Sequence, residues 1–188
     1  MDTGNTTEKE IQPQEKRPLR YQETLEAFED VIEKFYYECE IDVYRTAVNN
    51  PPAEFDITPA RRRFEGEQGL GLPFTYTEEE LDLMTESDKK KEVGHDAISV
   101  HDTEEREIKE ARRAETSFAK KHTPEEAIAH QETARGRYVM KLHITPETGL
   151  ISRTFHNGHG NVLLREGVKI EDILAKDYEI KEFKYDNE

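Results

Sequence analysis

Residues 23–39, ETLEAFEDVIEKFYYEC, place large apolar side chains at alternating steps of three and four positions. This spacing is the pattern of an amphipathic helix, and acidic side chains beside it repeat with the same steps. The stretch therefore predicts a helix whose apolar face is bordered by carboxylates. We call Leu25, Phe28, Ile32, Phe35 and Cys39 the apolar stripe, and Glu23, Glu26, Asp30 and Glu33 the acidic flank.

The predicted helix extends outward from this stretch over residues 19–48. Pro51 and Pro52 end it, because proline has no amide hydrogen to donate. Its last third is ambiguous, since Ile41 and Val43 alternate with acidic residues as they would in a strand. The helical spacing also continues through this part, and helix is our preferred interpretation.

The composition divides the rest of the chain into three segments. Residues 1–18 are polar and predict a tail, whereas 49–76 are rich in proline and glycine and predict an extended arm on another surface. Residues 77–188 predict a domain of helices followed by a β-sheet. The expected anchors of the arm are Phe55, Phe64, Leu70, Leu72 and Phe74.

Capping boxes mark the starts of three charged central helices. In such a box, an N-cap side chain and an acidic residue three positions later satisfy free backbone amides. The predicted boxes are Thr77 with Glu80, Asp102 with Glu105, and Thr123 with Glu126.

Strand-like segments gather in the last quarter of the chain. Residues 138–144 and 150–156 predict a hairpin that pairs Ile144 with Ile151, because this register puts the apolar side chains on one face. The fold class that follows is α+β. It has a long N-terminal amphipathic helix, charged central helices and a small antiparallel β-sheet at the C-terminal end.

The chain is polar and acidic: 34% of its residues are hydrophobic, 37% are charged, and the net charge is −15. This composition predicts a small core with long solvated helices or extended arms, or a fold completed by a partner, since little apolar surface offsets the entropy of folding. The negative charge opposes direct binding to nucleic acid or to an anionic membrane. The first residues lack a signal-peptide pattern and the one cysteine, Cys39, cannot form an internal disulfide, so we expect a cytoplasmic location.

These features predict a non-enzymatic protein-protein interaction component of a larger assembly, without a cofactor. The partner would present an apolar groove with basic flanks, matching the apolar stripe in shape and the acidic flank in charge. The residues expected to bind this partner are Glu23, Leu25, Glu26, Phe28, Asp30, Ile32, Glu33 and Phe35. The alternative that remains open is an ordinary amphipathic helix that packs on the domain's own sheet.

The histidines support a second interpretation, a small hydrolase or phosphodiesterase. The tripeptides HDT at 101–103 and HIT at 143–145 are similar, over these six residues, to the paired motif of two-histidine phosphoesterases. That similarity implies His101 and His143 as the acid and base that act across a phosphodiester.

Two other interpretations remain open. His156 and His159, in the tetrapeptide HNGH, form an alternative group that would act with His143 in hydrolysis, or that would hold a metal. The chain could also be an acidic inhibitor that presents carboxylates to a nucleic-acid-binding protein.

Overall fold

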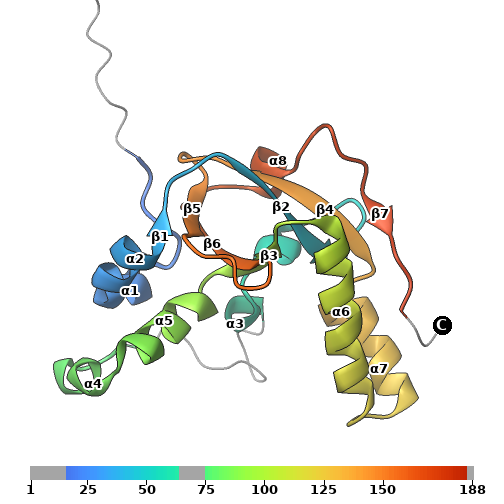
Figure 1. Ribbon diagram of the computed structural model, residues 1–188, viewed down its shortest axis with the longest axis horizontal. Coiled ribbons are helices and arrows are strands. Elements are labelled where there is room, and N and C mark those ends of the chain that lie inside the picture. The colour runs from blue at the N-terminus through green and yellow to red at the C-terminus, as the bar shows by residue number, and fades with distance from the viewer. Residues whose placement is uncertain (1–15, 64–74, 186–188) are drawn as a thin grey trace, which may run out of the picture.

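The computed structural model describes residues 16–63 and 75–185, which form a curled seven-stranded antiparallel sheet with helices around it. Figure 1 shows helices beneath both ends of this sheet. The strands are β1 (Tyr36–Tyr37), β2 (Ile41–Ala47), β3 (Ile98–His101), β4 (Tyr138–Ile144), β5 (Gly149–Ser152), β6 (His159–Leu164) and β7 (Lys181–Glu182). The helices are α1 (Gln22–Leu25), η1 (Glu26–Phe28), α2 (Glu29–Phe35), η2 (Glu54–Ile57), α3 (Ala60–Arg63), α4 (Glu78–Leu83), α5 (Glu86–His95), α6 (Glu104–Ala119), α7 (Pro124–His130), η3 (Gln131–Arg135) and α8 (Ile170–Ile173).

The strands follow the order β1-β5-β6-β3-β2-β4-β7, so β2 and β3 lie among strands from the last part of the chain. The prediction of a small sheet confined to the C-terminal end is therefore wrong. The sheet draws strands from both halves of the chain, and it is large.

The predicted long N-terminal helix is also wrong, because the helical segment ends at Phe35 and the chain continues as β1 and β2. Tyr36 already has the extended backbone of a strand. In β2 the alternation of side chains puts Val43 and Ala47 in the core of the sheet. The strand-like alternation at Ile41 and Val43 thus describes this part of the chain better than the helical spacing does.

The hairpin predicted between residues 138–144 and 150–156 does not form, since β4 and β5 pair with other strands. β4 pairs along its whole length with β2, from Ile41 opposite Ile144 to Ala47 opposite Tyr138. The shorter β5 pairs with β1 and β6 instead. The longer ladder with β2 satisfies more backbone groups of β4 than a hairpin with β5 could.

Both faces of the sheet are covered. One face encloses a core that includes Val43, Ile98, Leu142 and Val162. The apolar stripe of α1, η1 and α2 packs against the opposite face, together with residues of α5 and Leu163 of β6. The stripe residues Leu25, Phe28 and Ile32 are thereby buried within the chain itself.

Truncation of the apolar stripe should destabilise the fold. Leu25 is 2% exposed, whereas Leu83 in α4 is 85% exposed, so the two leucines offer a matched comparison. We expect Leu25→Ala to lower the free energy of unfolding by about 2–5 kcal/mol, because it leaves a cavity. Leu83→Ala should change that free energy by no more than about 0.5 kcal/mol. Urea denaturation of both variants checks this, and equal small losses would show that the stripe is not a core element.

Part of the predicted arm belongs to the body of the fold. The buried Asp56 carboxylate accepts hydrogen bonds from the backbone amides of Val48 (2.6 Å) and Ala53 (2.9 Å), which fixes the turn after β2. Ile57 lies in the core, and Phe55 packs against the Arg63 guanidinium at 4.5 Å. The other predicted anchors and most of the predicted tail lie outside the described residues, namely Phe64, Leu70, Leu72, Phe74 and residues 1–15.

Gly136, which connects η3 to β4, has a backbone φ of 88°, a conformation that other residues rarely adopt. A Cβ atom there would lie 2.2 Å from the carbonyl oxygen of Ala47. We expect Gly136→Ala to lower the free energy of unfolding by about 1–3 kcal/mol, measured by urea denaturation. Gly94→Ala in α5 is the control, since its Cβ would come no closer than 3.9 Å to a neighbour and alanine favours helix. A loss as large in Gly94→Ala would contradict this reasoning.

Among the described residues, no helix combines the length and the apolar character that crossing a bilayer requires.

Candidate functional site: a pocket lined by arginine and histidine

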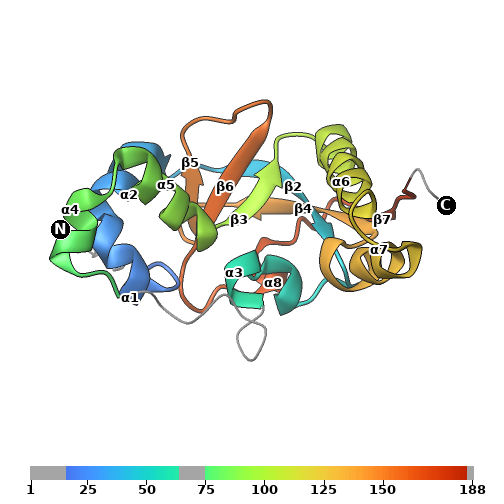
Figure 2. The ribbon, with the colours of Figure 1, turned by 90° about the horizontal axis from the view of Figure 1, so that it is seen from below.

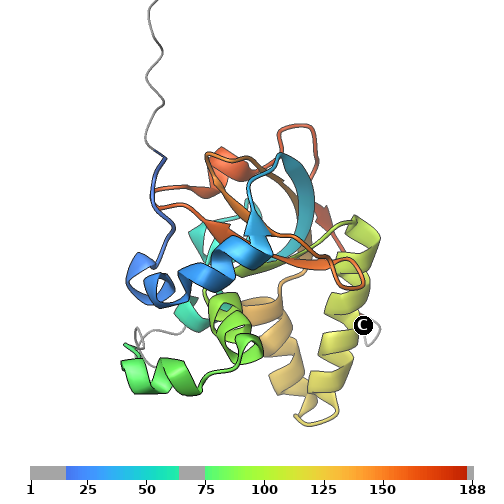
Figure 3. The same cartoon turned by 60° about the vertical axis from the view of Figure 1, so that its left-hand side comes forward.

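A pocket of about 1200 Å³ lies beside β2 and β3, with α3 and α5 on one side and α6, α7 and η3 on the other. Figure 2 shows these two groups of helices on either side of the central strands, and Figure 3 shows both groups beneath the sheet. Five of the seven histidines of the chain line this pocket, and so do five arginines. They are His95, His101, His130, His156 and His159, with Arg45, Arg61, Arg63, Arg113 and Arg135.

Strand register brings two of these histidines together. His101 at the end of β3 is directly opposite His159 at the start of β6, and cross-strand neighbours share one face of a sheet. Their rings meet edge to face, with centroids 5.3 Å apart. A tight turn at Asn157 and Gly158, both with positive φ, returns the chain so that β6 begins at His159.

Glu107 of α6 orients the ring of His101. One carboxylate oxygen of Glu107 lies 2.5 Å from Nδ1 of His101, and the other accepts the backbone amide of Thr46 at 2.7 Å. His101 and Glu107 are each only 7% exposed. The carboxylate assigns the proton to Nδ1 and leaves Nε2 of His101 as the nitrogen available for chemistry.

The environment of His159 favours its neutral form. Burial lowers the pKa of His159, and the neighbouring His101 lowers it further. The pocket therefore contains two imidazoles in different environments, one bound to a carboxylate and one partly desolvated. Such pairs are typical of acid–base sites.

Arg45 and Arg63 are held by backbone carbonyls. Arg45 donates from Nε to the carbonyl oxygen of Asp56 (2.7 Å) and from Nη1 to that of Ser99 (2.6 Å). Arg63 donates from Nε to the carbonyl oxygen of Thr58 (2.9 Å). Within the described part of the chain, neither guanidinium forms an ion pair with a carboxylate, although the carboxylates of Asp56 and Glu107 are near enough to act on Arg45 electrostatically.

Arg135 of η3 adds a third cationic group. No hydrogen bond or ion pair joins its side chain to any of the described residues, and its Nε is buried without a partner. Burial lowers the pKa of Arg63 to about 10, and repulsion from Arg45 and Arg135 contributes to this shift. The pKa of Arg45 is lowered by burial in the first place and by Arg135 as well. These guanidinium groups therefore form a cationic cluster to which the described part of the chain supplies fewer counter-charges than there are arginines.

A second carboxylate–imidazole pair lies farther along α6. Glu115, buried like Glu107, lies 2.9 Å from Nδ1 of His130, whose ring stacks on Phe118. Glu107, Ala111 and Glu115 follow each other at four-residue steps, which places them along one face of α6. That face is turned toward the pocket and the sheet.

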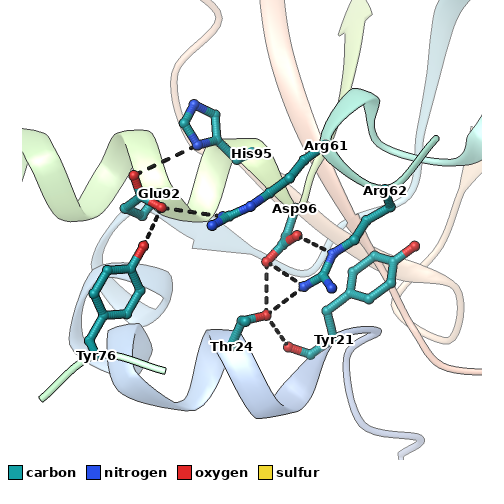
Figure 4. Close-up of polar contacts among 8 residues, drawn as sticks. All are labelled: Tyr21, Thr24, Arg61, Arg62, Tyr76, Glu92, His95 and Asp96. Atoms are coloured by element: carbon teal, nitrogen blue, oxygen red, sulfur yellow. Dashed lines mark hydrogen bonds and ion pairs between the residues drawn. The ribbon is translucent and has the colours of Figure 1, made fainter. Parts of the chain in front are cut away.

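The opposite end of the pocket is polar too. Glu92 of α5 accepts a hydrogen bond from the Tyr76 hydroxyl at 2.5 Å and pairs with Arg61 at 3.2 Å, as Figure 4 shows. Burial and the Glu92 carboxylate raise the pKa of Tyr76. His95 lies 3.7 Å from the same carboxylate. The carboxylate of Glu92 is thus neutralised by its own neighbours.

The structure separates His101 from His143. His143 of β4 is bound to Asp42 at 2.8 Å and lies 3.4 Å from Glu40, outside the pocket. β2 lies between the strands of the two histidines, so two strand spacings, about 10 Å, separate their backbones. The structure instead brings His101 together with His159 and His156. Among the described residues, no group of three or more His, Cys, Asp or Glu side chains is arranged to hold a metal.

The residues predicted to bind a protein partner have two different environments. Leu25, Phe28 and Ile32 are buried in the chain, and Phe35 is half-buried with the Lys90 ammonium 3.9 Å from its ring centre. The acidic flank is exposed to solvent, namely Glu23, Glu26, Asp30 and Glu33. The accessible part of the predicted contact surface is therefore mainly this acidic flank, with part of the Phe35 side chain.

Sequence reasoning missed the arginine cluster and both buried glutamates. Glu107 and Glu115 could have been found, because they share a helical face with Ala111 inside the apolar stripe of that helix. Arg45 could have been noticed as a charged residue in the strand pattern of residues 41–47, because it lies between Val43 and Ala47 at a position where the alternation places apolar side chains. Arg63 and Arg135 gave no local signal.

The lowered pKa of His159 predicts a stability change with pH. In the unfolded chain His159 binds a proton near its ordinary value of 6.5, whereas in the folded chain it does so only at lower pH. Between the pKa of His159 in the folded chain and that in the unfolded chain, the unfolded state binds more protons. The free energy of unfolding should therefore fall as pH falls below about 6.5. His159→Gln should reduce this slope, as measured by urea denaturation at several pH values. An unchanged slope would contradict the assigned environment.

No protein-family model matches the chain, and no curated protein and no solved structure is significantly similar to it.

Proposed function

We propose that this chain is a small hydrolase of phosphate esters, with the pocket as its active site. The observation that supports this most is the position, beside an oriented imidazole, of three guanidinium groups that form no ion pair with a carboxylate of the described residues. The guanidinium groups belong to Arg45, Arg63 and Arg135, and the imidazole belongs to His101.

A cationic cluster of this kind favours an anionic ligand. Like charges in a partly desolvated site raise the free energy of the empty protein, and an anion relieves that cost. Guanidinium groups present several donors in one plane, which matches the oxygen atoms of a phosphoryl group. The ligand is a small molecule, because a net charge of −15 repels a polyanion such as nucleic acid.

The two imidazoles act on the water that attacks phosphorus. Nε2 of His101 accepts a proton from water, and the water oxygen forms a bond to phosphorus. Neutral His159 accepts a second hydrogen bond from the same water and so orients it. The bond from phosphorus to the ester oxygen breaks, its electron pair stays on that oxygen, and that oxygen takes a proton from solvent. The products are a phosphate and an alcohol, and the imidazolium of His101 returns its proton to solvent.

The surrounding residues support this step. Glu107 holds the ring of His101 in one orientation and stabilises the imidazolium that forms, as carboxylates do in hydrolase triads. The arginines stabilise the negative charge on the phosphoryl oxygens. This is a form of the hydrolase predicted from the histidines, with His159 in the place of His143.

A substrate panel tests the proposal. We expect the full chain to release p-nitrophenol from p-nitrophenyl phosphate or from bis(p-nitrophenyl) phosphate, and His159→Ala to slow this release. His143→Ala is the control, since His143 lies outside the pocket, and it should retain the rate of the unmodified chain. Absence of turnover on both substrates would exclude the hydrolase, and loss of turnover in His143→Ala alone would assign the reaction to another site.

The predicted role in an assembly stays a separate proposal, supported by the exposed acidic flank rather than by the buried apolar stripe. Such a contact would be electrostatic and would weaken with salt. The single free thiol of Cys39 supports a reducing, cytoplasm-like compartment as part of the same proposal.

A further inference from the structure

The three consecutive arginines of α3 contact different parts of the fold, and Figure 4 shows the first two of them, Arg61 and Arg62. Arg61 reaches Glu92 of α5, and Arg62 reaches Asp96 at the end of α5. Arg63 turns to the pocket, where it belongs to the cationic cluster. Arg62 and Asp96 do not line the pocket, so neither would contact a substrate of the proposed hydrolase.

The ion pair between Arg62 and Asp96 is buried and bidentate. Nε of Arg62 lies 2.7 Å from Oδ1 of Asp96, and Nη2 lies 3.1 Å from Oδ2, with side chains only 6% and 1% exposed. The Thr24 hydroxyl lies 2.9 Å from both Nη2 of Arg62 and Oδ2 of Asp96, and so bridges the pair. The ring of Tyr21 covers the guanidinium at 4.1 Å.

The Arg62–Asp96 pair holds α3, a helix too short to be stable on its own. α3 has only four residues, a single turn, and isolated helices of that length are unstable in water. Its orientation must therefore come from contacts of its side chains with the rest of the fold. A buried bidentate pair defines that orientation more closely than an exposed one does.

We propose that Asp96 and Arg62 are positioning residues for the pocket, which hold α3 so that Arg63 faces the bound anion. This inference rests on the proposed function, because it assumes that the pocket binds a phosphoryl group. Asp96 would then control anion affinity without touching the anion.

A double-mutant cycle with inorganic phosphate as the probe tests this proposal. Isothermal titration would compare the full chain with Asp96→Asn, Arg63→Ala and the variant with both changes. We expect each single change to weaken phosphate binding by about fivefold or more, and Asp96→Asn to add almost nothing once Arg63 is absent. Additive effects would overturn the proposal, and so would unchanged affinity in Asp96→Asn.

Two further variants separate positioning from general damage. Thr24→Val removes only the bridging hydroxyl, so it keeps the proposal testable if Asp96→Asn does not fold, and it should weaken phosphate binding in the same non-additive way. Asp30→Asn removes the same charge from an exposed carboxylate that pairs with Lys89, a contact that also links an N-terminal helix to α5, and it should leave the affinity unchanged. If Asp30→Asn weakens phosphate binding as much as Thr24→Val does, the Arg62–Asp96 pair does not position Arg63. If the unmodified chain binds no phosphate, the proposed function itself fails, and that result is distinct from these.

Discussion

Replacing His101 with alanine should reduce kcat for hydrolysis of a phosphate ester by about 10²–10⁴, the usual contribution of a positioned acid or base. KM should change little, because the arginines rather than His101 hold the phosphoryl group in this account. Glu107→Gln keeps a hydrogen-bonding side chain beside Nδ1 but removes the charge. It should reduce kcat less, because His101 remains in place without the carboxylate that stabilises its imidazolium form.

Steady-state kinetics on p-nitrophenyl substrates separates these effects. A rise in KM with constant kcat in His101→Ala would assign His101 to binding and remove it from the chemical step. Thermal unfolding must accompany the kinetics, because His101 and Glu107 are both buried. For a variant that unfolds at the assay temperature, the kinetics of that variant and of the unmodified chain are measured at a lower temperature.

Arg135→Gln should have opposite effects on stability and on ligand binding. The Arg135 side chain forms no hydrogen bond with the described residues, and its charge repels those of Arg45 and Arg63. Without phosphate, the free energy of unfolding should rise by about 1 kcal/mol, roughly 2–4 °C in Tm for a domain of this size. Phosphate affinity should fall about tenfold or more, because a charged donor is lost.

Arg153→Gln is the matched control for this pair of measurements. It removes the same charge from an exposed position outside the pocket. We expect it to leave both phosphate affinity and Tm nearly unchanged. A fall in Tm for Arg135→Gln would mean that Arg135 stabilises the empty protein, and the argument from unrelieved repulsion would then be incorrect.

Local signals in the sequence located several helix starts. Thr77 and Thr123 are the N-caps of α4 and α7 and form the predicted capping boxes, because this motif depends on residues within a single turn. The start of α6 is displaced by one residue, with Thr103 rather than Asp102 as the N-cap. Either side chain can accept an amide hydrogen, so the sequence did not decide between them.

The architecture was harder to predict, because the pattern of residues 41–47 satisfies two periods at once. Val43 and Ala47 are four positions apart, which fits a helix, but alternation with polar side chains also fits a strand. Pairing with β3 and β4 decides in favour of the strand. Those partners lie far along the chain, and local spacing contains no information about them.

The candidate site was hidden for the same reason. His101 and His159 become neighbours through the register of β3 and β6, and Arg63 and Arg135 reach the same pocket from separate short helices. The sequence identified both histidines as candidates. The pairs expected from it, however, were His101 with His143 and His156 with His159. Only tertiary structure shows that, within residues 16–63 and 75–185, these arginines lack ion pairs with carboxylates.

The central claim is that the arginine cluster binds a phosphoryl anion, and NMR spectroscopy of the arginine Nε–H groups tests it most directly. Titration of the intact chain with inorganic phosphate should shift the resonances of Arg45, Arg63 and Arg135 along one binding curve. The Arg135 resonance should move most, since its Nε is buried and has no hydrogen-bond partner among the residues that the structure describes. If these three resonances stay still while those of exposed arginines such as Arg153 move, the pocket is not an anion site and the account is contradicted.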